Sequence, residues 1–229
     1  EQHRDHVHEV ALVGGEPLLL PENNRLLDVI PKDSIVTLIT NLSVDLENNK
    51  IFQKLATRNK VGWSMSFDNV GDQLEYVRYG ATWDKIKHNL AIIKNLMSTQ
   101  GQWGGIHAVY NMYNATRICE LREFAETTGT SVLWQNLFQP EYLDPFLHGP
   151  KVAALAAAEI EKFYAMDIAT PAEKQFFDQA LIRYRAVTHA SDNISEQFKQ
   201  HIQDNETKFH PDKLGEFSRL WPELDKIYD

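Results

Sequence analysis

Short apolar runs alternate with amphipathic stretches over roughly the first two thirds of the chain. Five of these runs are bounded by turn-forming residues, as is typical of buried strands, and they cover residues 8–13, 34–40, 61–67, 106–112 and 131–137. Apolar residues recur at helical spacing in about 47–58, 83–98 and 115–128, which lie between them. This alternation predicts parallel βα units, and hence a barrel-like or open α/β sheet.

The pattern changes beyond Pro140. Pro150 introduces an alanine-rich helix over residues 152–166, a second helix begins near Thr170-Pro171, and helical pieces continue to the C-terminus. We therefore expect two parts, an α/β part over residues 1–147 and an α-helical C-terminal appendage over residues 148–229.

Composition narrows the class of protein. The 229 residues are 43% hydrophobic and 24% charged, which is typical of a globular chain. A net charge of -9 without a basic cluster argues against a nucleic-acid partner. The longest apolar stretch, residues 152–158, is too short to cross a bilayer, so we expect no membrane partner. The single cysteine, Cys119, agrees with a reducing, cytoplasmic location, and its amphipathic surroundings predict a buried, inert thiol.

Polar residues follow each predicted strand. The carboxyl ends of parallel strands meet at one edge of a sheet, where α/β folds bind their ligands. These residues are Gly14-Gly15-Glu16-Pro17, Asn41, Ser66 with Asp68, Asn111, and Asn136. Their convergence predicts a ligand site at this edge.

Each of these residues also has a plainer interpretation. Gly14-Gly15 could form only a tight turn, but a turn does not need the carboxylate of Glu16, which suits an ammonium or a hydroxyl. Ser66 and Asp68, spaced to share a face, suit a ribose diol, or else a strand end followed by a helix cap. Asn41 could be a simple turn residue. Arg78 fits a ligand carboxylate, or alternatively an ion pair with Glu75.

The three histidines near the N-terminus, His3, His6 and His8, form a local cluster of metal-ligand type. No carboxylate or cysteine completes a coordination set with them, so we expect solvated side chains and no metal site.

The motifs taken in order resemble the radical S-adenosylmethionine enzymes, most closely the group with a twitch-type C-terminal region. The resemblance extends over about residues 7–95 and, more faintly, 107–147. The segments that carry it are Gly14-Gly15-Glu16-Pro17, Thr40-Asn41, Ser66-Phe67-Asp68, Glu75-Tyr76-Val77-Arg78 and Gly80-Ala81-Thr82-Trp83.

This resemblance implies a partial (β/α) barrel, here truncated to about five parallel strands. It implies that Gly14 to Pro17 hold the amino group of S-adenosylmethionine, that Ser66 and Asp68 face its ribose, and that Arg78 meets its carboxylate. Enzymes of this family cleave the cofactor reductively at a 4Fe-4S cluster and take a hydrogen atom from a peptide or small-molecule substrate. Asn41 and Asn111 complete the expected cofactor site, while the catalytic residues stay unassigned.

The sequence departs from the family at the cluster. Three cysteines in a C-x-x-x-C-x-x-C loop hold it in the family, whereas this sequence has one cysteine, far beyond the glycine loop. We expect an inactive fragment that lacks the first strand and the cluster loop, since Glu1 is not an initiator methionine and a lost strand exposes backbone. One alternative is a complete cluster-free scaffold, whose open sheet edge could be covered in a homodimer. The other is an ordinary α/β-barrel enzyme that binds a sugar or phosphate.

Overall fold

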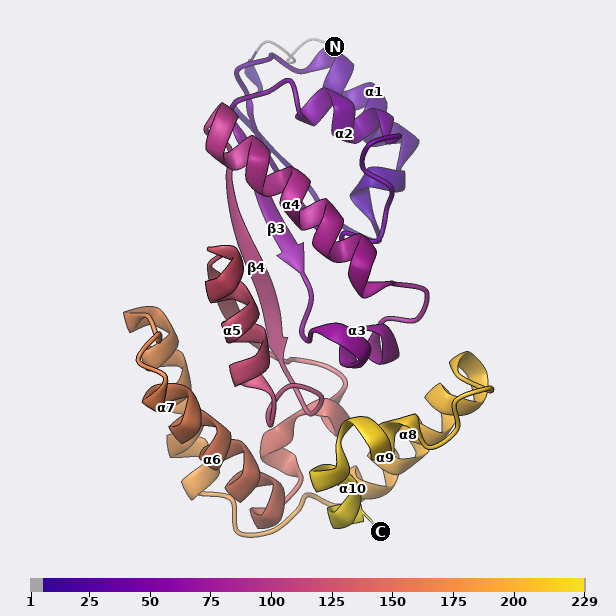
Figure 1. The fold of residues 1–229 in the computed structure, drawn as a ribbon, viewed down its shortest axis with the longest axis vertical. Helices are drawn as coiled ribbons and strands as arrows, with labels where there is room; N and C mark the ends of the chain where they lie inside the picture. Colours follow the sequence, from indigo (N-terminus) through magenta and orange to yellow (C-terminus); the bar gives the residue numbers. More distant parts are fainter. Residues whose placement is uncertain (1–5, 229) are drawn as a thin grey trace. The chain divides into compact units, whose positions relative to one another are not determined.

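The computed structural model describes residues 6–228 (Figure 1). Its five strands form one sheet in the order β1-β2-β3-β4-β5. They are β1 (Glu9–Leu12), β2 (Ile35–Thr40), β3 (Val61–Ser66), β4 (Trp103–Tyr110) and β5 (Val132–Asn136). The recorded pairings of β1 with β2, β2 with β3 and β3 with β4 are all parallel. The prediction of a partial α/β barrel with five strands and a helical C-terminal region is confirmed.

The residues group into two compact units. Unit 1 comprises Glu1–Phe67 and Gly80–His107, and unit 2 comprises Asp68–Tyr79 and Ala108–Asp229. Each unit is described by itself below. The division into parts 1–147 and 148–229 stays a prediction.

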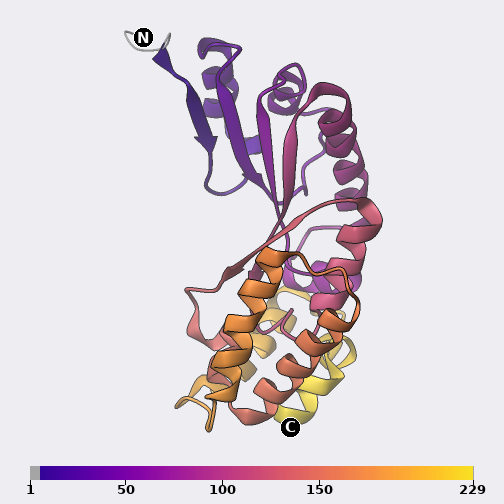
Figure 2. The ribbon, with the colours of Figure 1, turned by 90° about the vertical axis from the view of Figure 1, so that its left-hand side faces the viewer.

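In unit 1, helices cover one face of the sheet (Figures 1 and 2). These helices are α1 (Pro21–Val29), α2 (Lys50–Leu55) and α4 (Trp83–Gln100), with the short 3-10 helix η2 (Pro17–Leu19) after β1. Burial alternates accordingly along β2: Val36 and Leu38 are buried, while Thr37 is half-buried and Ile39 is exposed. In β3, Trp63 and Met65 are buried while Ser64 and Ser66 are half-buried, so the period-2 pattern reflects one covered and one open face.

Strand β4 begins at Trp103, three residues before the predicted start at Ile106. Gly104 and Gly105, which lie outside the predicted strand, are paired strand residues. A Cβ atom at Gly104 would clash with the Trp63 carbonyl oxygen. The glycine therefore lets β3 and β4 approach each other, and this requirement is not visible in the local sequence.

Unit 2 is mainly helical. Its helices are α3 (Gly71–Val77), α5 (Ile118–Thr128), α6 (Pro150–Ala165), α7 (Pro171–Arg185), α8 (Ile194–Phe209), α9 (Glu216–Leu220) and α10 (Pro222–Tyr228), with 3-10 helices η3 (Glu141–Leu143) and η4 (Pro145–Leu147). An aromatic cluster that includes Tyr76, Tyr113, Phe198 and Trp221 forms one core. The Trp221 indole donates to the Tyr113 carbonyl at 2.9 Å, which fixes the C-terminal helices to the segment after β4.

Helix α3 was not predicted, because seven residues beginning with a glycine are too few to display helical periodicity. Among the described residues, no helix is both long and apolar enough to cross a membrane.

Candidate functional site

The loop after β1 depends on two glycines with positive φ. Gly14 has φ of 87° and Gly15 has φ of 25°, a region that residues with side chains rarely adopt. A Cβ atom at either position would meet no other atom within 4 Å. The glycines are therefore needed for the backbone conformation, and the space beside them is open.

Glu16 ties this loop to the end of β2. Its Oε1 and Oε2 accept from the Thr40 hydroxyl at 3.0 and 3.1 Å, and Oε2 also accepts from the Asn41 amide at 3.0 Å. The Leu18 amide donates to Oε1 at 3.2 Å, which makes Glu16 the N-cap of η2. Pro17, buried at the first position of η2, fixes the direction of the chain after the carboxylate. The predicted pair Glu16 and Asn41 thus lies together, and buried Thr40 joins them.

The loop after β2 is rigidly bonded. The Asn41 Oδ1 accepts from the Ser43 amide at 2.9 Å and from its hydroxyl at 2.7 Å. Asn89 of α4 donates to the carbonyls of Leu42 and Val44 at 2.7 and 2.6 Å. Asn41 is therefore a turn residue, as its plainer interpretation had it, and its backbone amide still contacts Glu16.

Ser66 is the last residue of β3 and pairs in register with His107 of β4. Both side chains are half-buried. They belong to the face of the sheet that the helices of unit 1 leave open, together with Ser64 and Gly105, which also pair in register. Polar side chains and a glycine therefore line this part of the sheet.

Asp68 belongs to unit 2 and contacts two groups there. Its Oδ1 accepts from the Val109 amide at 2.7 Å, and its Oδ2 lies 3.2 Å from the Arg78 guanidinium. Arg78 caps the C-terminal end of α3, and its side chain is about a quarter exposed. Arg78 therefore forms an ion pair with Asp68.

Asn111 directly follows β4, and its polar groups are used inside the turn. Its Nδ2 donates to the Val109 carbonyl and its Oδ1 accepts from the Tyr113 amide, both at 2.8 Å. The side chain of Asn114 accepts from the Asn111 amide at 2.8 Å and donates to the same Val109 carbonyl. Asp68 and Asn111 thus meet at Val109, in a network that the sequence did not reveal because Asn114 was not singled out.

The residues present do not fit an iron–sulfur cluster. Cys119 is buried in α5, as predicted, its thiol lies 3.7 Å from the Glu159 carbonyl, and burial raises its pKa to about 12. No group of three or more potential metal-ligating side chains occurs in residues 6–228. Of the three histidines, His3 lies outside the described residues.

The comparisons with known proteins begin with two negative results. No protein-family model matches the sequence, and no curated protein matches it.

Solved structures do resemble the chain. Streptococcus suis SuiB bound to S-adenosylmethionine has a TM-score of 0.51 at 16% identity over 71% of this chain and 36% of SuiB. SuiB bound to the precursor peptide SuiA has a TM-score of 0.50, again at 16% identity, over 71% of this chain and 36% of SuiB. Native anSMEcpe with bound AdoMet has a TM-score of 0.50 at 18% identity over 69% of this chain and 46% of that protein.

The chain spans less than half the length of these structures, which are radical S-adenosylmethionine enzymes. At such low identity the likeness is one of fold. This chain has the fold of the radical S-adenosylmethionine enzymes.

Proposed function

We propose that this chain is the S-adenosylmethionine-binding part of a radical S-adenosylmethionine enzyme, and that Gly14 to Pro17 take the amino group of the cofactor. The observation that carries this proposal is the fixed carboxylate of Glu16 at the carboxyl ends of β1 and β2. An ammonium group is complementary to such a carboxylate.

The loop leaves room for this ligand. A carboxylate has about four lone-pair sites. In Glu16 the Leu18 and Asn41 amides occupy one site each, and the hydroxyl of Thr40 shares a single hydrogen between both oxygens. One acceptor site is then left for an ammonium. The open space beside Gly14 and Gly15 would let a ligand approach the loop backbone.

The finer roles extend the proposal to the other candidate residues. Ser66 and Asp68 would face the ribose, and Arg78 the methionyl carboxylate. Because Oδ2 of Asp68 already contacts Arg78, a ribose hydroxyl there has to share or displace that contact. Asn41 and Asn111 would act by holding the loops after β2 and β4.

The bound cofactor would supply a 5'-deoxyadenosyl group, which enzymes of this family use to take a hydrogen atom from a substrate. The thiolates that the cluster needs are not in this sequence, so turnover would require cluster ligands from outside it. We keep a peptide or small molecule as the substrate class. The precursor peptide bound to SuiB supports a peptide.

Isothermal titration tests the proposal. We expect S-adenosylmethionine to bind this chain and Glu16→Gln to weaken that binding about tenfold, which corresponds to about 1.4 kcal/mol for one charge-assisted contact. The variant should leave the affinity for 5'-methylthioadenosine unchanged, because that nucleoside has no amino acid group. Glu9→Gln, at an exposed carboxylate in β1, is the matched control and should change neither affinity.

Two outcomes would contradict the proposal. Binding of glucose 6-phosphate without any binding of S-adenosylmethionine would favour an ordinary α/β-barrel enzyme. A folded chain that binds neither ligand would favour a scaffold that has lost the cofactor.

A further inference from the structure

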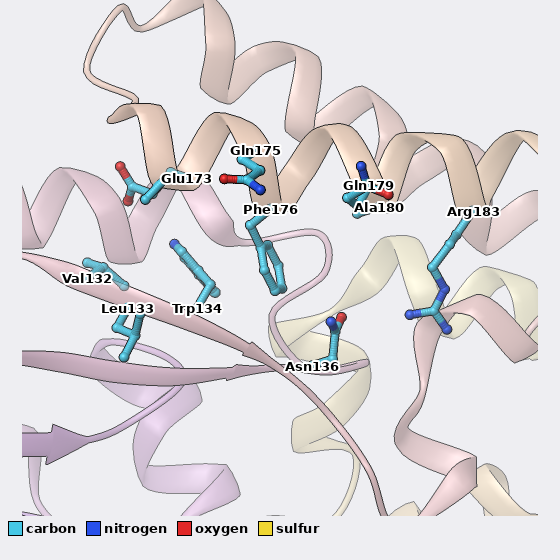
Figure 3. A pocket seen from close by; sticks show the side chains of 11 residues that line it. Val132, Leu133, Trp134, Asn136, Glu173, Gln175, Phe176, Gln179, Ala180 and Arg183 are labelled. Atoms are coloured by element: carbon cyan, nitrogen blue, oxygen red, sulfur yellow. The ribbon is translucent and has the colours of Figure 1, made fainter.

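A groove in unit 2 lies between β5 and α7 (Figure 3). Its volume is about 320 Å³, within the range of sites that hold small ligands or peptide side chains. One wall comes from alternate residues of β5, Val132, Trp134 and Asn136, which share one face of the strand. The other comes from one stripe of α7, namely Ala172, Gln175, Phe176, Gln179, Ala180 and Arg183.

Trp134 lines this groove and carries a buried donor without a partner in its indole. The side chain is 7% exposed, and its ring is held by edge contacts with Tyr110 and Phe177 at centroid distances of 6.3 and 5.2 Å. Its Nε1 has no hydrogen-bond partner in the described structure. Buried donors are rarely left unpaired, so this atom points to an acceptor that a ligand supplies.

The edge of the sheet beside the groove is open as well. β5 stands last in the strand order, so one of its backbone edges has no neighbouring strand among the described residues. Leu133 is 64% exposed. An open strand edge next to a helix-walled groove is the geometry by which extended peptides are bound as an added strand.

The charges of the groove favour a peptide that carries a carboxylate at one end. Glu173 is buried, and its Oε1 lies 3.1 Å from Arg122, so its charge is already neutralised. The Arg183 side chain is 46% exposed, and its contact with Asp144 is a long 3.5 Å. Its guanidinium stacks 3.5 Å above the Phe146 ring, which holds it near Asn136 at one end of the groove. The accessible charge of the lining is thus positive.

We propose that the groove between β5 and α7 binds an extended peptide, which adds to the edge of β5, accepts a hydrogen bond from the Trp134 indole and directs a carboxylate toward Arg183. An apolar side chain of the peptide packs against Phe176. This peptide site lies wholly within unit 2 and does not depend on S-adenosylmethionine binding.

Nuclear magnetic resonance of the 15N-labelled chain tests this proposal with the probe Ac-Thr-Val-Phe-Val-Thr-Glu-NH2. The sequence has five tryptophans, and Trp134→Phe identifies the indole signal that matters. We expect the probe to shift the Trp134 indole proton downfield and to shift the backbone amides of residues 132–136. Replacing the central Phe of the probe by Pro should weaken binding about tenfold or more, because proline interrupts strand pairing. Replacing its Glu by Lys should weaken it about fivefold through the loss of the Arg183 contact.

A blocking variant gives the second test. Gln179→Trp fills the groove from an exposed position of α7 and should abolish the probe-induced shift. Lys174→Trp, the same residue at an exposed position of α7 outside the lining, should leave it intact. Well-dispersed amide signals show that each variant is folded.

Three results would overturn the proposal. The first is an unmoved Trp134 signal at millimolar probe, and the second is a shift that survives in Gln179→Trp. The third is a shift of Trp134 that depends on protein concentration without any peptide, because the occupant would then be a second copy of this chain. None of these results bears on the titration of S-adenosylmethionine, so failures of the two proposals are distinguishable.

Discussion

The loop at residues 14–17 and the groove between β5 and α7 differ in whether their polar groups have hydrogen-bond partners within the chain. In the loop, the carboxylate of Glu16 accepts from three donors within the chain. In the groove, the Trp134 indole donates to nothing in the described structure. The first has a recognisable motif, and the second has none. The motif therefore indicates a loop whose backbone is already fixed, whereas the unpaired donor indicates a site where a ligand could supply the acceptor.

The largest expected effect concerns the helix that walls the groove. Glu173→Ala removes the buried partner of Arg122 and the side chain that accepts from the Thr170 amide at 2.9 Å. Breaking this buried pair should lower the free energy of unfolding by about 4 kcal/mol, measured by urea denaturation, even though Arg122 keeps its contact with Glu126 at 2.9 Å. Lys174→Ala is the control, with an expected change under about 0.5 kcal/mol.

The double variant Arg122→Met with Glu173→Met sharpens this result. It removes both charges together and should recover part of the loss. A single Glu173→Ala variant as stable as the control would mean that the groove wall does not depend on this pair.

Acid should weaken unit 2 through His148. Its Nε2–H donates to the Tyr142 carbonyl at 2.9 Å, its Nδ1 accepts from the Tyr228 hydroxyl, and its backbone pairs with Ala190 just beyond α7. Burial lowers the pKa of His148 to about 4. In the unfolded chain this imidazole binds a proton near pH 6.5, whereas in the folded chain it stays neutral down to about pH 4. Its contribution to the free energy of unfolding therefore falls as the pH drops from about 6.5 toward about 4, and it is constant below that.

Urea denaturation at pH 7 and pH 4 measures this loss, which should be about 3 kcal/mol for this group. His148→Gln keeps a donor and an acceptor but does not titrate, so its pH dependence should be flatter. His189→Gln, at an exposed histidine, should retain the parent's slope. Equal slopes in both variants would assign the acid sensitivity to other groups.

A smaller effect tests the loop itself. Glu16→Ala leaves the Thr40 hydroxyl and the Asn41 amide without their acceptor, and Thr40 is only 1% exposed. We expect the free energy of unfolding to fall by about 2 kcal/mol, together with the cofactor affinity. Glu9→Ala should be neutral in both measurements. Lost affinity at unchanged stability would mean that the carboxylate serves the ligand alone.

Much of the fold follows from the sequence because periodicity is a local property. The alternation of Val61, Trp63 and Met65 with smaller residues predicts β3 and its two faces. The early start of β4 could not be predicted, since Gly104 is required by the backbone of Trp63 on another strand. Helix α3 escaped because it is too short for its pattern to appear.

In the candidate site, too, the local features could be predicted and the contacts between distant residues could not. Gly14, Gly15 and Glu16 were predictable because a positive-φ turn and a carboxylate are encoded in adjacent residues. The contacts of Thr40 with Glu16 and of Asn114 with the Asp68 carbonyl depend on how separate loops meet. The groove depends on the packing of α7 beside β5, and no sequence motif predicts that packing. The roles of Ser66, Asp68 and Arg78 toward a cofactor stay predictions.

The smallest effect compares two indoles directly. Trp63 of unit 1 donates from Nε1 to Gln102 Oε1 at 2.7 Å, whereas Trp134 of unit 2 has no such partner. Changing either to Phe removes the same atoms, but only Trp63→Phe leaves a buried acceptor unpaired, since Gln102 is 4% exposed. We therefore expect Trp63→Phe to cost about 1 kcal/mol more than Trp134→Phe in urea denaturation. If Trp134→Phe proved the costlier change, its indole would have an acceptor in the free protein, and the groove would lose its unused donor.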